Sequence, residues 1–268
     1  MGTKASGTQW VVPTEPIGTK IFSSVVDLTL WMAVYIAHLG VPQSRYGAAF
    51  RAQIGADRFL SQWNYETIKR AIAHARRNRL LQPVKKGRHA LPEITQAGKR
   101  RLAELLPTYD TKRTWDGRMH LVTYDIPETQ GDDRAALRDF IRKIGAAHLQ
   151  DSVWITPYNP IDTLRSFITD HSLSGTVIVS DLGRDGSIGE EDLQSLVARV
   201  WRLDLLNDRY VEWIAEAKRS KRIDQWMTMA YLSILKDDPQ PPFPLLPLWW
   251  KGDQAYRLIA PKLGEIQI

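Results

Sequence analysis

The stretch from Asn64 to Leu102 constrains the fold of this chain more than any other. Its first part, residues 64–81, has apolar residues at the spacing of one helical face: Ile68, Ala71, Ile72 and Ala75. The opposite face of such a helix is mostly charged: it carries Glu66, Lys69, Arg70, Ala73 and Arg77, with His74 and Arg76 on its flanks. The pattern predicts a helix with one buried face and one basic face.

A second cationic element follows this helix. Residues 82–84 and 89–91 are short extended runs around Lys85-Lys86-Gly87-Arg88, and a glycine between such runs predicts a hairpin, here with a basic tip. Thr95 is a suitable cap for a closing helix over residues 96–106. Two earlier helices are expected at residues 23–39 and 44–54, because Gly40 and Pro42 would end the first. Helices followed by a hairpin predict a winged helix-turn-helix.

The basic face has two interpretations. Charged runs on amphipathic helices are usually solvated surface and nothing more. Two cationic elements close together favour DNA instead, with the helix in a groove and the hairpin on the backbone. The residues expected to contact DNA are Tyr65, Lys69, Arg70, His74, Arg76, Arg77, Lys85, Lys86 and Arg88.

Positive charge is confined to the first part of the chain. Residues 1–115 hold 18 of the 36 Lys and Arg but only 7 of the 30 Asp and Glu, a balance of +11, whereas the remaining residues have a balance of −5. Such a separation suits a protein in which one domain attracts a polyanion and the rest does not. The chain has no cysteine, which excludes disulfides and thiolate metal sites.

Targeting signals are not evident in the sequence. Residues 1–22 lack the apolar core of a secretory signal and are expected to be a flexible leader. The longest apolar run, residues 25–41, contains Asp27 and His38 and is too short to span a bilayer comfortably, so it predicts a buried helix. We therefore expect a cytoplasmic protein without membrane contact.

A different pattern begins after a polar boundary at residues 107–116. Strands are predicted at residues 120–126, 146–149, 152–156 and 176–180, and helices at 134–144 and 159–171. This βαββαβ order is the ferredoxin-like arrangement. The last third is predicted to be helical, with a break near Asn207 and an irregular Pro-rich segment at residues 237–247.

The overall prediction is an α+β protein of several domains. Residues 23–110 form the winged helix-turn-helix, 116–185 the ferredoxin-like domain and 188–268 a helical C-terminal domain.

Several motifs resemble the PaaX-like family of transcriptional repressors. They are Trp115-Asp116-Gly117-Arg118, LVTYDIPE (Leu121 to Glu128), SVWITP (Ser152 to Pro157) and LLPLWWKGDQA (Leu245 to Ala255). The resemblance covers roughly residues 24–260. It departs from the family in the additional leader and in the doubled Trp249-Trp250.

This resemblance implies a bacterial homodimer with an N-terminal winged helix, a middle domain like the small CRISPR-associated ferredoxin-fold nuclease, and a helical C-terminal domain. It also implies operator binding that a small effector relieves, an aryl-acetyl-coenzyme A thioester in the founding member. An acyl-CoA-like effector is therefore expected here, but its identity does not carry over.

Asp125 supports an alternative function. It ends the first strand of the ferredoxin-like domain, where the related nuclease holds a metal-binding aspartate, and a pair of such aspartates from two copies can bind Mg²⁺ and activate water. Against a metal-dependent nuclease, the strand supplies no further ligand, and Asp125 is equally suited to cap the turn at Pro127. We expect no catalytic residue.

Two other motifs have ordinary structural explanations. Residues 181–192 partly match a calcium loop, but an acidic turn ahead of a helix fits them better. Five tryptophans, Trp201, Trp213, Trp226, Trp249 and Trp250, are either core or the lining of an effector pocket. No cofactor is expected, because the histidines lack ligand spacing and no phosphate-binding glycine loop is present.

Overall fold

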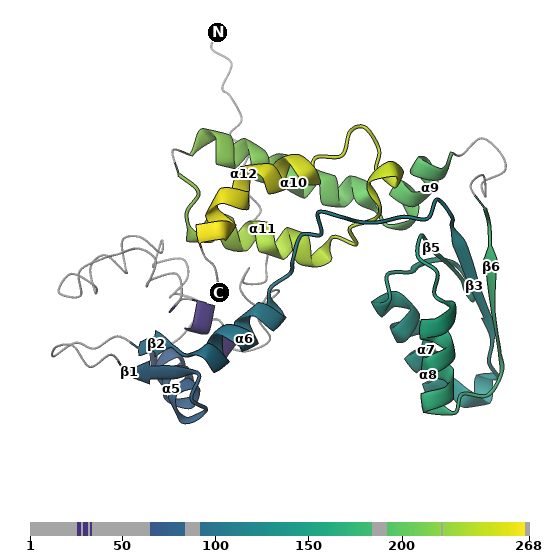
Figure 1. Ribbon diagram of the computed structural model, residues 1–268, viewed down its shortest axis with the longest axis horizontal. Coiled ribbons are helices and arrows are strands. Elements are labelled where there is room, and N and C mark those ends of the chain that lie inside the picture. The colour runs from purple at the N-terminus through teal and green to yellow at the C-terminus, as the bar shows by residue number, and fades with distance from the viewer. Residues whose placement is uncertain are drawn as a thin grey trace, which may run out of the picture. The chain divides into compact units, whose positions relative to one another are not determined.

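The computed structural model describes residues 26, 27, 29–31, 33, 65–83, 92–183, 192–220 and 222–265 (Figure 1). By their internal contacts, the residues divide into two compact units, and each unit is assembled from separate stretches of sequence. The first unit comprises residues 1–108, 213–236 and 255–268. The second comprises residues 109–212 and 237–254.

The first unit contains a helix, two short strands and a second helix in succession. They are α5 (Tyr65–Arg77), β1 (Leu81–Pro83), β2 (Pro92–Ile94) and α6 (Gln96–Leu105). The strands pair antiparallel, with Leu81 opposite Ile94. The predicted strand at residues 89–91 and the hairpin tip lie outside the described residues, and so do the leader and the second predicted helix.

Helix α5 ends four residues earlier than the apolar spacing predicted. Arg79 has a left-handed backbone with φ 56°, and the N–H of Leu80 donates to the carbonyl oxygen of Ala75 at 2.8 Å. A left-handed residue followed by such a bond is a common way to close a helix. Leu80 and Leu81 are both buried, which is why their spacing suggested a longer helix. Because of the turn at Arg79, however, Leu81 is the first residue of β1.

Helix α6 begins at its predicted cap. The Thr95 hydroxyl oxygen accepts a hydrogen bond from the N–H of Gly98 at 3.1 Å, and the hydroxyl donates to the carbonyl oxygen of Arg79 at 2.6 Å. Farther along α6, Arg101 Nε donates to Oδ1 of the fully buried Asp27 at 2.5 Å. The cap and the ion pair thus hold α6 against the end of α5 and against the helical residues around Asp27.

The second unit contains one antiparallel sheet with helices on one face (Figure 1). Its strands are β3 (His120–Asp125), β4 (Ala147–Gln150), β5 (Val153–Thr156) and β6 (Thr176–Asp181), in the order β4-β5-β3-β6. The covering helices are α7 (Gly131–Lys143) and α8 (Ile161–His171), and a 3₁₀ turn, η2 (Glu128–Gln130), precedes α7. The predicted α+β class and βαββαβ order are confirmed. Helix α7 begins three residues earlier than predicted, with Asp132 and Asp133 in its first turn, where acidic side chains favour a helix N-terminus.

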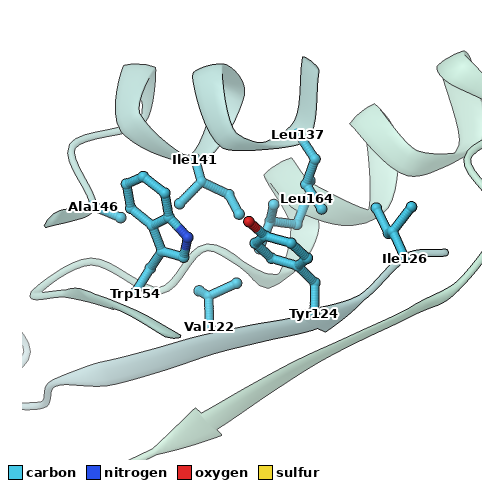
Figure 2. Close-up of a cluster of buried hydrophobic side chains, with 8 residues drawn as sticks. All are labelled: Val122, Tyr124, Ile126, Leu137, Ile141, Ala146, Trp154 and Leu164. Carbon is cyan, nitrogen blue, oxygen red and sulfur yellow. The ribbon is translucent and has the colours of Figure 1, made fainter. Parts of the chain in front are cut away.

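The core of this unit lies between the sheet and the two helices (Figure 2). Alternate residues of the strands point into it, because successive side chains of a strand face opposite sides of the sheet. The buried cluster consists of Val122, Tyr124, Ile126, Leu137, Ile141, Ala146, Trp154 and Leu164. Val177 and Val179 of β6 pack against the same cluster, which fixes the helix-covered face of that strand.

A buried cation joins the two stretches of the second unit. The Arg113 side chain is fully buried, with its guanidinium carbon 4.6 Å from the ring centroid of Tyr109 and 4.7 Å from that of Phe243. One of its terminal nitrogens lies 3.9 Å from an oxygen of Asp253. A guanidinium between two rings and beside a carboxylate is well stabilised away from water.

Helices dominate the last third of the described chain, as predicted. They are α9 (Leu193–Val200), α10 (Leu203–Arg219), α11 (Gln225–Asp237) and α12 (Gly252–Glu265), and the Pro-rich segment contains a 3₁₀ turn, η3 (Phe243–Leu245). The predicted break near Asn207 is wrong. The chain turns at Arg202, which has φ 52°, whereas Asn207 lies within α10 and its side-chain oxygen accepts the N–H of Lys251 at 2.8 Å.

Candidate nucleic-acid interface

Helix α5 has a buried edge and a basic exposed surface. Ala71 and Ala75 are buried, one helical turn apart, and Ile72 is half-buried beside them. The predicted burial of this face is therefore confirmed at these positions. Small residues on the buried edge allow the helix to lie close to its neighbours, so the long side chains are left to the exposed surface.

The exposed surface of α5 holds most of the DNA-contact residues predicted from the sequence. Those with exposed side chains are Lys69, Arg70, His74, Arg76 and Arg77. Tyr65 begins the helix, and its side chain lies outside the described residues. Five exposed side chains on a helix of 13 residues, four of them permanently cationic, make a strong local attraction for polyanions.

The last turn of α5 also has a structural reason to be basic. His74, Arg76 and Arg77 lie where the carbonyl ends of the helix concentrate partial negative charge, so cations there stabilise the helix itself. Lys69 and Arg70 lie in the middle of the helix, where this effect is small. Stabilisation of the helix therefore explains the cations of the last turn but does not explain Lys69 and Arg70, which fit a binding surface better.

The base of the predicted wing is present in the described residues. Strands β1 and β2 pair over three residues each, and the Gln82 side-chain amide donates to a carboxylate oxygen of Glu93 at 3.3 Å. The predicted tip residues Lys85, Lys86 and Arg88 lie outside the described part of the chain.

One exposed cation beside this surface was missed among the predicted contacts. Arg79 is exposed and directly follows α5. The run Arg76-Arg77-Asn78-Arg79 was visible in the sequence, but a helix extended to residue 81 assigned Arg79 no special position. The turn that ends α5 places it between the basic helix and β1.

Asp125 is exposed at the end of β3, opposite Thr176 of β6. Among the described residues, no three or more His, Cys, Asp or Glu side chains are grouped closely enough to hold a metal ion. Within the described part of one copy, Asp125 therefore does not belong to a group of three or more such ligands.

The ends of the possible calcium loop have structural roles. An oxygen of Asp181 accepts the N–H of Gly183 at 2.7 Å, and its other oxygen pairs with Arg118. Asp192 caps α9 by accepting the N–H of Ser195 at 2.7 Å, as the helix-start interpretation predicted. These bonds lower the pKa of both carboxyl groups below their usual values. Residues 184–191 lie outside the described residues.

The tryptophans of the last third are mainly packed rather than gathered around one cavity. Trp213 donates its indole N–H to the carbonyl oxygen of Met227 at 2.8 Å, and Trp250 packs edge-on against Tyr210. Trp249 is 43% exposed. It lines a cavity of about 620 Å³ whose walls are Asp192, Gln194, Ser195, Ala198, Arg199, Arg202, Asp204, Pro247, Leu248 and Trp249.

No described helix is both long enough and apolar enough to cross a bilayer.

Comparisons with known proteins bear mainly on the second unit. Residues 112–194 match the family model of the PaaX protein central Cas2-like domain. Among solved structures, the uncharacterized protein Rv0674 from Mycobacterium tuberculosis is similar, with a TM-score of 0.54 and 18% identity over 91% of this chain and 98% of that one. At that identity the likeness shows a shared fold alone. A comparison with curated proteins finds no match.

The family model and the sequence motifs coincide. The motifs from Trp115 to Pro157 lie inside the matched residues, and those residues carry the sheet and helices of the second unit. The resemblance to the PaaX-like family is therefore confirmed over residues 112–194, which match the model of its central Cas2-like domain.

Proposed function

We propose that this protein is a DNA-binding transcriptional regulator of the PaaX-like type, a repressor that binds operator DNA through a winged helix-turn-helix. The observation that carries the proposal is the basic surface of α5, where Lys69 and Arg70 are exposed in mid-helix while Ala71 and Ala75 are buried. A recognition helix needs this division, because one edge must pack against the domain while the other enters a groove.

The distribution of charge supports the same function. The +11 balance of residues 1–115 belongs to the part of the chain that contains α5, and the −5 balance belongs to the remainder. Attraction to phosphates is sequence-independent and salt-dependent, so it supplies affinity and orientation rather than specificity. In the proposed complex, Arg70 and its neighbours on α5 face base edges, and Lys85, Lys86 and Arg88 contact phosphates.

A salt titration of a combined variant tests this proposal. Replacement of Arg70, Arg77, Lys85 and Lys86 by Ala should abolish operator binding and flatten the dependence of log Kd on log salt concentration. A matched control removes four exposed cations elsewhere: Arg138, Lys143, Arg219 and Arg257. Both variants change the net charge equally, so only the position of the charges differs. Equal affinity and equal slope in both variants would refute the DNA-binding role of α5.

The proposed regulator acts as a homodimer in the cytoplasm, where its DNA is. One winged module makes few base contacts, and two related by a two-fold axis read paired half-sites with higher affinity and specificity. The resemblance to the PaaX-like family points the same way. Sedimentation that gives a monomer at micromolar concentration, both with and without DNA, would exclude the dimer.

We propose the cavity beside Trp249 as the effector site. It combines an exposed indole with the cationic side chains of Arg199 and Arg202, which suits a ligand with an aromatic or acyl group and an anionic end, such as an acyl-CoA. Calorimetric titration with phenylacetyl-CoA should give binding that Trp249→Ala weakens at least about tenfold. Unchanged binding in that variant would place the ligand elsewhere.

A metal-dependent nuclease is the second candidate, favoured by the exposed position of Asp125 at the end of β3 in a Cas2-like domain. Incubation of plasmid and linear DNA with Mg²⁺ or Mn²⁺ separates the two functions. A regulator leaves the DNA intact, and Asp125→Ala leaves operator binding within a few fold. Cleavage that disappears in Asp125→Ala would favour the nuclease.

A further inference from the structure

Among the described strands, β6 is an edge strand of the sheet of the second unit. In the order β4-β5-β3-β6 it pairs with β3 alone among the described strands (Figure 1). Its residues Thr176, Ile178 and Ser180 are exposed, and Ile178 is 54% exposed. An edge strand presents unpaired N–H and C=O groups, which makes it a template for another strand.

Within the described residues, the edge has few of the features that usually block such pairing. Natural edge strands are protected by charged side chains, especially Lys, by Pro, by bulges or by short length. The charged residue of β6 is Asp181 at its end, which pairs with Arg118; residues 176–180 contain neither a charged residue nor Pro, and β6 pairs with β3 over six residues without a bulge. An edge of this length and β-branched composition is suited to pairing with a further strand.

The sequence of β6 indicates which strand would pair with this edge. Residues 176–180 read Thr-Val-Ile-Val-Ser, the same pattern of hydroxyl, valine and isoleucine in either direction. In an antiparallel pair of two identical strands centred on Ile178, valine meets valine and Thr176 meets the partner's Ser180. We infer that β6 of one copy pairs with β6 of a second copy across a two-fold axis at Ile178, so that the two sheets become one sheet of eight strands.

The hydrogen bonds within the sheet permit this register. The N–H of Leu182 donates to the carbonyl oxygen of Met119 at 2.8 Å, and the N–H of Met119 donates to the carbonyl oxygen of Gly183 at 3.4 Å, so the N–H of Leu182 faces β3 just beyond the β3–β6 ladder. Because the direction of the backbone groups alternates along a strand, those of Ile178 face β3 and those of Val177 and Val179 face outward. Val177 can then exchange both bonds with the partner's Val179, and Ile178 meets the partner's Ile178 at the close, non-hydrogen-bonded spacing.

The side chains around the axis are compatible with this pairing. Val177 and Val179 pack on the helix side of the sheet, so Ile178 points to the other face, where it contacts its own symmetry mate. At the end of the pairing, Asp181 lies opposite the partner's Gly175, which has no side chain to obstruct it. Asp181 also keeps its own counter-charge, Arg118. Both copies therefore place α7 and α8 on the same side of the combined sheet.

This interface rests on the homodimer of the proposed function, and it names the surface that makes it. The absence of cysteine from the sequence allows a direct test by oxidative cross-linking, because a single introduced thiol has no competing partner. Ile178→Cys should form a disulfide-linked dimer under mild oxidation, since Cα atoms at a non-hydrogen-bonded pair are about 4.5 Å apart and within disulfide range.

The matched controls lie in the same strand. Thr176→Cys and Ser180→Cys are equally exposed, but each lies about 13 Å from its own symmetry mate in this register, by the rise per residue of a strand. Alone, each should cross-link at least about tenfold less than Ile178→Cys. An equal mixture of the two, in which half of the randomly paired dimers are heterodimers, should cross-link about half as much as Ile178→Cys. Equal cross-linking of all three single variants, or failure of Ile178→Cys in a protein that sediments as a dimer, would overturn the interface.

A charge variant gives a second readout. Ile178→Lys, with like charges at the axis, should sediment at half the dimer mass, and so should Ile178→Glu, whereas a mixture of the two should recover the dimer. Ile161→Lys on α8, an exposed apolar position of the same unit, should remain dimeric. A dimer that persists in Ile178→Lys refutes the interface while DNA binding can still hold. Unchanged DNA binding in the α5 variants, together with intact Ile178→Cys cross-linking, refutes the proposed function alone.

Discussion

The backbone of Leu80 and the α-carbon of Gly98 approach so closely that no side chain fits at residue 98. A Cβ built there would lie 2.4 Å from the carbonyl oxygen of Leu80 and 2.7 Å from a side-chain carbon of Ile94. The nearest obstacle is backbone, which cannot rotate away as a flexible side chain can. This contact holds α6 against the turn between α5 and β1.

Gly98→Ala should therefore destabilise the first unit by about 1–3 kcal/mol, the usual cost of an added methyl group in a packed site. Chemical denaturation measures the change. Gly131→Ala is the control, because no heavy atom lies within 4 Å of a Cβ at the first residue of α7, and it should be neutral or stabilising. Similar losses in both variants would show that the close contact with Leu80 does not set the cost at residue 98.

Arg79→Gly should raise the free energy of unfolding by about 0.5–1 kcal/mol, because glycine adopts φ 56° without the strain of a side chain. Arg79→Ala removes the same charge and keeps the strain, so it should give no gain. If DNA binding weakens equally in both variants while only the glycine variant is more stable, charge and backbone contribute separately at this residue. A gain in both would mean that repulsion among the cations dominates instead.

Arg113→Ala should lower the stability of the second unit by about 2–4 kcal/mol, since it removes a buried guanidinium from between two rings and leaves Asp253 without its cation. Arg113→Lys should recover only part of the loss, because an ammonium lacks the planar stacking surface. Thermal unfolding measures both. The exposed pair of Arg165 with Asp162 provides the comparison, and Arg165→Ala should cost less than about 1 kcal/mol.

The raised pKa of Asp238 predicts that the free energy of unfolding falls as the pH rises. It is buried and accepts bonds from the Tyr210 hydroxyl at 2.9 Å and the Gln240 N–H at 2.8 Å, yet burial raises its pKa above the usual value. The folded state then holds this proton more tightly than the unfolded state, so its contribution to stability falls as the pH rises above roughly 4. Asp238→Asn should flatten that fall in urea unfolding measured from pH 4 to 8.

Asp192 contributes a pH dependence of stability with the opposite sign, and it serves as the control. The Ser195 N–H lowers the pKa of Asp192, so its contribution is present above the unfolded pKa and is lost as the pH falls. Asp192→Asn should therefore lose stability mainly above pH 4. Identical pH profiles for the wild type and Asp238→Asn would contradict the role given to Asp238.

The cations of the proposed DNA interface should differ in whether they contact a base edge or a phosphate. Arg70→Ala should cost about 1–3 kcal/mol on operator DNA and little on random DNA, because the proposed contact is to a base edge. Lys85→Ala should weaken both and lower the salt slope by about one unit, as expected for one phosphate contact. Fluorescence anisotropy at several salt concentrations measures both effects. Equal losses on both DNAs for Arg70→Ala would make it a phosphate contact.

The sheet of the second unit could be predicted from its sequence because local patterns and tertiary packing agree there. Val122 and Tyr124 alternate with less buried neighbours, and the same residues form the core seen in Figure 2. The ends of α5 and α10 could not be predicted in this way. Helix α5 ends shortly before Arg79, and helix α10 begins directly after Arg202. Both arginines have a positive φ, and an arginine in the sequence does not indicate a turn as a glycine would.

The sequence predicted which residues of α5 are cationic and exposed better than it predicted contacts between distant parts of the chain. The cations of α5 follow from helical spacing alone, and the described residues confirm that Lys69 and Arg70 are exposed. Their contact with DNA stays a prediction. The role of Arg113 could not be foreseen, because Tyr109 is near it in sequence but Phe243 and Asp253 are far from it. A lone arginine in a polar boundary gives no indication of burial when its partners lie more than a hundred residues away.

The assembly of the first unit from residues 1–108, 213–236 and 255–268 limits how such proteins can diversify by recombination. A single crossover near residue 108 would transfer α5 and α6 into another gene but leave behind two stretches with which they cluster. A complete exchange requires crossovers at four positions, and three of them interrupt helices: α10 after residue 212, α11 after residue 236 and α12 after residue 254. For the proposed regulator, new DNA specificities should therefore arise by point substitution on the exposed surface of α5 and not by exchange of a complete DNA-binding unit between genes.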